Sequence, residues 1–209
     1  MGSPKLSVLG LGGALAPILF SSVTLVGAYM RPEYSHLDNF ISELGATDTP
    51  NADIMNFIGF IPSGLLFVLF AISLLLFYAR TTLAKAGTIL LIVFGLGMAL
   101  AGIYSCDPGC PPHGSPETTI HDQISAVTFI SAIFGIVLLG ISFKSSTPFK
   151  KLRNYSILSG IVAAILLVIM IDSFESRALT GIWQRLLLLT IFLWTTIIGS
   201  SIYDINKDW

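Results

Sequence analysis

Histidine and carboxylate side chains stand close together at two places in this sequence. His121 is followed by Asp122, and His36 lies seven residues before Glu43, so a helix would put His36 and Glu43 on one face. Imidazole and carboxylate groups together suit a catalytic zinc ion or a harder divalent ion. The candidate metal ligands are His36, His121 and Asp122. Because the sequence contains no HExxH motif, a hydrogen-bonded polar cluster without metal is the favoured interpretation, and no cofactor is assigned.

The same groups could instead activate a serine. Ser42 would be the nucleophile, with His36 or His121 as its general base. Glu43 or Asp122 would orient that base. Such a site would make the protein a hydrolase of a lipid-like substrate, and a metal-bound water is the alternative nucleophile. The candidate catalytic residues are therefore His121, Glu43, Ser42 and Asp122.

Arg185 lies about one turn inside the last apolar segment, where an ionisable side chain is costly and needs a partner. Its planar fork of donors could hold the carboxylate or phosphate of a lipid head group. The alternatives are a position at the membrane interface, or an internal salt bridge to Glu43, Asp122 or Asp172. Arg177, in the preceding loop, is expected to be an exposed surface charge. The candidate binding residues from this reasoning are Arg185, Gln184, His36 and Asp38.

The chain that must hold these residues has the composition of a membrane protein. Hydrophobic residues make up 54% of it and charged residues 11%, against about 25% in an ordinary soluble domain. Six apolar segments have the length of a transmembrane helix. They are residues 8–29, 54–78, 87–104, 120–143, 155–171 and 182–203. We predict an all-α membrane protein, with residues 1–209 forming a single bundle of six transmembrane helices. Pro62 is expected to kink the second of them.

The charged residues between these segments are sorted by sign. Loops one, three and five hold ten of the twelve acids, and the remaining connections and termini hold eight of the eleven bases. Because short loops rich in Lys and Arg stay cytoplasmic, we expect both termini inside and loops one, three and five outside. The ten acids are Glu33, Asp38, Glu43, Asp48, Asp53, Asp107, Glu117, Asp122, Asp172 and Glu175. The eight bases are Lys5, Arg80, Lys85, Lys144, Lys150, Lys151, Arg153 and Lys207.

Loop one carries a helical pattern of its own. Leu37, Phe40, Ile41 and Leu44 recur at helical spacing, polar residues fill the other face, and Gly45 is a helix stop. This pattern predicts a short amphipathic helix that lies on the outer surface or re-enters the membrane. Its polar face would be turned toward the bundle or toward water.

Cys106 and Cys110 both fall in loop three, on either side of a Pro-Gly turn. A turn of that kind could bring the two sulfur atoms within bonding range. On the outer side of a membrane a disulfide persists. A structural disulfide is therefore favoured over two free thiols, metal ligation or a redox site.

Several of these strings resemble a known family. They are Tyr34-Ser-His-Leu-Asp-Asn-Phe-Ile-Ser-Glu-Leu-Gly-Ala46, Asn56, His121-Asp122 and Gly181-Ile-Trp-Gln-Arg185. Together they resemble the bacterial and archaeal family called domain of unknown function 998, over nearly the whole chain. The resemblance implies a six-helix membrane bundle with a polar signature at Ser42, Glu43, Asn56, His121, Gln184 and Arg185. It thereby adds Asn56 to the candidate binding residues. It also implies a prokaryotic cytoplasmic membrane. The loop-one string is distantly similar to the DRAM and Sfk-type membrane proteins, which are linked to lipid handling.

Three functions follow from these observations. The leading hypothesis is an outward-facing polar site that binds a lipid or other amphiphile, with Arg185 and Gln184 on the head group and Glu43 and His121 lining the cavity. The alternative is the hydrolase described above. Transport ranks third, because the spans carry no charge at mid-depth and show no inverted repeat. Membrane lipids are the expected partners and nucleic acid is not, and the oligomeric state is left open.

Overall fold

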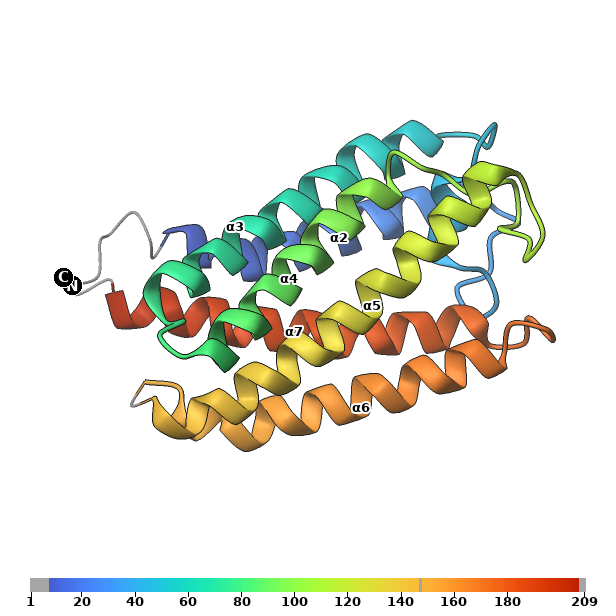
Figure 1. Cartoon of the computed structure of the whole chain (residues 1–209). Coiled ribbons are helices and arrows are strands. Elements are labelled where there is room, and N and C mark those ends of the chain that lie inside the picture. The colour runs from blue at the N-terminus through green and yellow to red at the C-terminus, as the bar shows by residue number, and fades with distance from the viewer. Residues whose placement is uncertain (1–7, 147, 207–209) are drawn as a thin grey trace.

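The computed structural model describes residues 8–146 and 148–206, and its regular secondary structure in these residues is all helical (Figure 1). In this part of the chain six helices are long and apolar enough to cross a membrane. The protein is thus a multi-pass membrane protein, and the predicted six-helix bundle is confirmed. The six spans are Val8–Tyr29, Ile54–Phe77, Thr82–Ala101, Pro116–Ser145, Lys150–Asp172 and Thr180–Ile205.

Within these spans the α-helices are α2 (Gly12–Tyr29), α3 (Ile61–Phe77), α4 (Thr82–Ala101), α5 (Pro116–Ser142), α6 (Arg153–Asp172) and α7 (Thr180–Asn206). Short 3-10 helices, η1 (Ile41–Gly45), η3 (Phe143–Ser145) and η4 (Lys150–Leu152), lie in the connections, and a π-helix, η2 (Ile54–Phe60), precedes α3. Consecutive α-helices pack on one another, and α7 packs against α2, so the bundle closes on itself.

Two helices, α4 and α5, begin about four or five residues earlier than their apolar pattern predicts, and a hydroxyl caps each of them. The Thr81 hydroxyl accepts a hydrogen bond from the backbone of Ala84 at 3.1 Å, which starts α4 at Thr82. The Ser115 hydroxyl does the same for Thr118 at 3.2 Å, and Pro116 takes the first helical position of α5. The polar first turns of α5 are therefore helical and stand at the end of the bundle.

The interruption expected at Pro62 lies just before it. Proline has no N–H to donate within a helix. In this chain the seven residues of η2 wind as a π-helix, and regular α-helix begins at Ile61, next to the proline. The π-helix holds the buried Asn56, which contacts loop one.

Close backbone contact and packed aromatic rings hold the bundle together. A Cβ atom on Gly64 of α3 would lie 2.5 Å from Gly95 O and from Ala99 N of α4, so only glycine permits this approach. In the interior, the ring of Phe67 lies 5.0 Å from that of Phe94 and 5.5 Å from that of Phe192. Packing of this kind is what associates helices in a membrane, where lipid tails are as apolar as the side chains.

Residues 31–53, 102–115 and 173–179 lie together at one end of the bundle, at the right of Figure 1. Three contacts join them: Thr47 N donates to Cys106 O at 2.8 Å, Leu179 N to Asp38 Oδ1 at 3.0 Å, and Arg177 Nη2 to Gly109 O at 2.7 Å. We call this the acidic end, since it holds loops one, three and five. For the described residues, the separation of acids from bases along the sequence is therefore also a separation in space. Lys5 and Lys207 lie outside the described residues.

The helix predicted in loop one is much shorter than expected. The helical residues are confined to η1, and the segment before it forms turns. Side chains compete with the backbone there: Asn39 Oδ1 accepts from Ser35 N at 2.7 Å, and Glu43 Oε1 accepts from Phe40 N at 2.8 Å. The expectation that Gly45 ends the helix is confirmed.

Candidate functional site

A cavity of about 340 Å³ lies at the acidic end, between α5, α6, the start of α7 and loops one, three and five. Its apolar lining comes mainly from α5 and α6 and includes Phe129, Leu167, Met170 and Ile171. Its polar lining consists of Ser42, His121, Asp122, Ser125, Arg177 and Gln184. The cavity is thus amphipathic, and each class of lining comes from several elements.

A second, smaller cavity of about 40 Å³ adjoins the first and reaches toward the aromatic core. It is large enough for ordered water. The residues that line both cavities are Ser42, His121, Ser125, Phe129 and Gln184. These shared residues form the junction between the amphipathic cavity and the interior of the bundle.

His121 is buried at this junction, with 3% of its surface exposed. Its Nδ1 atom lies 2.7 Å from the carbonyl oxygen of Tyr104. Because a carbonyl only accepts hydrogen bonds, this contact assigns the ring proton to Nδ1. In the neutral imidazole Nε2 is then a hydrogen-bond acceptor, and it has no partner among the residues that the structure describes. His121 therefore offers a base beside Ser42 and Ser125.

Gln184 is positioned in the same way by a single backbone contact. Its Oε1 atom accepts a hydrogen bond from Ile41 N at 2.7 Å. This contact fixes which end of the amide is oxygen. The amide NH₂ group, which has two hydrogens to donate, is left for the cavities that Gln184 lines.

Glu43 holds loop one together and does not line either cavity. Its carboxylate accepts hydrogen bonds from Phe40 N and from Asn39 Nδ2, both at 2.8 Å, and lies 3.6 Å from Arg177 Nη1. A buried carboxylate needs such partners to offset the loss of hydration. Its contacts make Glu43 a structural residue, and they do not include either candidate base.

Arg177 has a larger part than the exposed charge that we expected from sequence. Its Nη2 atom donates to Gly109 O at 2.7 Å and to Cys110 O at 2.6 Å, and its guanidinium lies 4.9 Å from the centre of the Phe40 ring. It therefore joins loop five to loops one and three and forms one wall of the cavity. One sequence signal could have found it. Three of the eleven Lys and Arg residues do not belong to the eight bases of the basic connections and termini, and all three are arginines: Arg31, Arg177 and Arg185.

Arg185 forms none of the salt bridges considered above, among the residues that the structure describes. It donates instead to Asn39 O at 3.1 Å, Gly181 O at 2.8 Å and the Tyr34 hydroxyl at 2.5 Å. Burial raises the pKa of Tyr34, with Arg185 opposing the shift, so the phenol stays protonated and donates to Phe40 O at 3.0 Å. Arg185 lies outside both cavity linings and fastens loop one to α7.

The other candidate binding residues also hold loops in place. Asn56 Nδ2 donates to Gly45 O at 2.9 Å and to Ser105 Oγ at 3.0 Å, which joins loops one and three. Asp38 accepts from Leu179 N and from the Ser35 hydroxyl, and these hydrogen bonds lower the pKa of its carboxyl. His36 stacks edge-on against Tyr34, with 5.5 Å between ring centres. None of the three lines a cavity.

The candidate metal ligands are divided between two places. His36 stands beside Tyr34, whereas His121 and Asp122 line the cavity. Among the described residues, which include all three histidines, no group of three or more His, Cys, Asp and Glu side chains is arranged to hold a metal ion. The set of His36, His121 and Asp122 is therefore not assembled in this structure.

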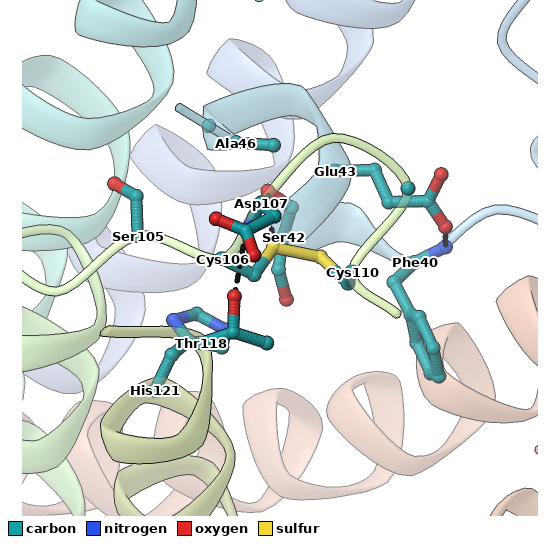
Figure 2. The surroundings of a disulfide bond; sticks show 12 residues. Phe40, Ser42, Glu43, Ala46, Ser105, Cys106, Asp107, Cys110, Thr118 and His121 are labelled. Carbon is teal, nitrogen blue, oxygen red and sulfur yellow. Dashed lines mark hydrogen bonds between the residues drawn. A yellow bond between two sulfur atoms is a disulfide. The ribbon is translucent and has the colours of Figure 1, made fainter. Parts of the chain in front are cut away.

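Loop three is closed by the predicted disulfide between Cys106 and Cys110, whose Cα atoms are 5.1 Å apart (Figure 2). The loop is fastened to α5 through Asp107, whose backbone N–H donates to Thr118 Oγ1 at 2.9 Å and whose carboxylate accepts from Ser115 N at 2.6 Å. The Ser115 hydrogen bonds lower the pKa of Asp107. This anchoring sets the position of Cys110, which borders the cavity.

Residues 14–201 match the family described as protein of unknown function, DUF998. The chain belongs to this family. No curated protein and no solved structure matches the chain, so the distant similarity to DRAM and Sfk-type proteins is not shown.

The positions that the resemblance to DUF998 singles out divide into two groups at the acidic end. Three of them line the cavities: Ser42, His121 and Gln184. The other three hold loop one against its neighbours: Glu43, Asn56 and Arg185. In this DUF998 protein the polar positions of the resemblance therefore supply both the lining of a cavity and the contacts that hold loop one beside it.

Proposed function

We propose that this DUF998 protein binds a lipid or another amphiphile in the cavity at the acidic end. The supporting observation is the division of the lining, with apolar side chains of α5 and α6 on one part and polar side chains of loop one, α5 and α7 on the other. A volume of about 340 Å³ falls within the range of small-molecule sites. A single alkyl chain with a small polar head matches such a lining.

The bundle supports this function by holding the polar wall in a fixed position. Gln184 docks η1 on α7, and Arg177 joins the three loops around the cavity. A wall of this kind loses little conformational entropy when a ligand binds. By the positive-inside rule we propose that the acidic end faces the outer side of a prokaryotic cytoplasmic membrane, so that the ligand would enter from the outer leaflet.

Filling the cavity tests the proposal. Ala126 and its neighbour Val127 are both exposed positions of α5, but only Ala126 lines the cavity. We expect an Ala126→Trp variant, purified in detergent, to lose co-purifying amphiphiles detected by mass spectrometry and to lose thermal stabilisation by added amphiphile. The matched Val127→Trp variant should retain both. Equal behaviour of the two variants would contradict binding at this place.

A hydrolase is the second candidate, and the tautomer of His121 favours it. Nε2 of His121 would take the proton of the Ser42 or Ser125 hydroxyl while the serine oxygen attacks an ester carbonyl. The imidazolium would return that proton to the leaving alcohol, and water would then release the acid from the acyl-serine. The orienting partner of His121 is the Tyr104 carbonyl, in place of the expected Glu43 or Asp122.

Turnover of a fluorogenic fatty-acyl ester tests the hydrolase. We expect loss of hydrolysis in His121→Ala and in one of the two variants Ser42→Ala and Ser125→Ala, with the other serine variant as control. Full turnover in His121→Ala would exclude this mechanism. No observation on the described residues favours transport over these two functions.

A further inference from the structure

The cavity contains a carboxyl group that forms no ion pair with any residue that the structure describes. Asp122 stands two turns into α5 and lines the cavity. Its carboxylate forms no hydrogen bond and no ion pair with any residue that the structure describes, and His121 and Arg177 act on it only through longer-range electrostatics. The side chain is exposed where it borders the cavity, so a charged group of a ligand could reach it.

Arg177 is not available as a partner of Asp122. Its Nη2 atom is held by the Gly109 and Cys110 carbonyls, and its Nη1 atom faces Glu43 at 3.6 Å. One arginine charge is thus set against the buried carboxylate of Glu43. The charge of Arg177 is therefore already compensated by Glu43. A positively charged group of a ligand could pair with Asp122 instead.

The remaining polar groups at the junction are rich in acceptors. His121 is buried, with 3% of its surface exposed, and its Nε2 atom has no hydrogen-bond partner among the described residues. Ser42 and Ser125 add hydroxyl oxygens, and Gln184 adds amide hydrogens. A primary ammonium carries three hydrogens and no acceptor, so it complements one carboxylate and the neutral acceptors around it. A phosphate would instead place a negative charge against Asp122.

We propose that the cavity selects a single-chain amphiphile whose head group is a primary ammonium, with Asp122 as its counter-ion and Leu167 and Met170 beside its alkyl chain. This selectivity rests on the proposed amphiphile-binding function. The volume favours one chain over a diacyl aminophospholipid, whose phosphate would share the same cavity of about 340 Å³ with Asp122.

Three probes with the same alkyl chain test the proposal: dodecylammonium, dodecanol and dodecyl phosphate. Their binding to the full chain in phosphatidylcholine nanodiscs is measured by calorimetry, with empty nanodiscs subtracted. We expect dodecylammonium to bind most tightly and dodecyl phosphate most weakly. Asp122→Asn should weaken dodecylammonium by about tenfold or more, the typical effect of losing a hydrogen-bonded charge, and leave dodecanol unchanged. Asp172→Asn, the same change at an exposed acid of α6 outside the cavity lining, should alter neither.

The outcomes distinguish a failure of the proposed head group from a failure of the proposed amphiphile binding. The ammonium proposal is overturned if dodecyl phosphate binds best, or if the wild-type protein binds the three probes with affinities that do not depend on their charge. Amphiphile binding stands in either case. Displacement of dodecylammonium by nanodiscs containing phosphatidylethanolamine would assign the site to an aminophospholipid and would overturn the single-chain ligand. If none of the three probes binds, both the proposal and the proposed function fail.

Discussion

The side-chain oxygen of Gln184 accepts a hydrogen bond from the backbone N–H of Ile41 at 2.7 Å, across 143 positions of sequence. This contact docks η1 on the first turns of α7. It sets the next residue, Ser42, at the junction of the two cavities and turns the Gln184 amide hydrogens toward them. One hydrogen bond thus positions two residues of the candidate site.

Loss of this hydrogen bond should lower the free energy of unfolding by a measurable amount. Gln184→Leu leaves the Ile41 N–H buried without an acceptor, which costs about 1 to 3 kcal/mol of unfolding free energy. We expect a lower midpoint in denaturant titration of the detergent-purified protein. Gln123→Leu, the same substitution at an exposed position of α5, is the control and should change the midpoint little. Equal effects of the two substitutions would contradict the docking role of Gln184.

Arg185 should be sensitive to the shape of its side chain as well as to its charge. Arg185→Lys keeps the charge but loses the planar fork that reaches Asn39 O, Gly181 O and the Tyr34 hydroxyl. We expect a loss of about 2 kcal/mol and faster amide hydrogen exchange in residues 37–45. Arg80→Lys, at an exposed position at the other end of the bundle, should have no such effect. Unchanged exchange in residues 37–45 would show that Arg185 does not fasten loop one.

The disulfide should stabilise the protein modestly, since it closes a short loop. For the five residues from Cys106 to Cys110, chain entropy predicts about 2 kcal/mol. We expect reducing agent to lower the free energy of unfolding of the wild-type protein by that amount, and its unfolding midpoint accordingly. A Cys106→Ser/Cys110→Ser variant should start from the lower midpoint and not respond to reductant. A response of the variant equal to that of the wild type would show that the reductant acts elsewhere.

Two acids should make the loops at the acidic end sensitive to low pH. Hydrogen bonds hold the pKa of Asp38 and of Asp107 below the ordinary value of 3.8. The stability that they contribute is therefore present above about pH 4 and is lost as the pH falls through their lowered pKa values. We expect the Leu179 and Ser115 amides to lose protection from hydrogen exchange in that range. Asp38→Asn should remove the dependence at Leu179 and leave Ser115 unchanged. Protection of both amides that persists well below pH 3 would contradict the proposed pH dependence.

The bundle could be predicted from sequence because its signals are local. Apolar length marks each span, and the Pro-Gly turn between Cys106 and Cys110 marks the disulfide. The shortening of the loop-one helix could not be predicted, because Asn39 and Glu43 take backbone hydrogen bonds that a helix would have used. The role of Arg177 depends on carbonyls 67 and 68 positions away. No periodicity in the sequence encodes a contact of that kind.

Binding in the cavity between α5 and α6 is tested most directly by locating a labelled ligand. The protein would be crystallised with 12-bromododecan-1-ol, and the anomalous signal of bromine would place the end of its chain. We expect a bromine peak near Phe129, Leu167 and Met170, absent from Ala126→Trp crystals. Bromine found only on the lipid-facing surface, or at the same position in the Ala126→Trp variant, would contradict the proposed site.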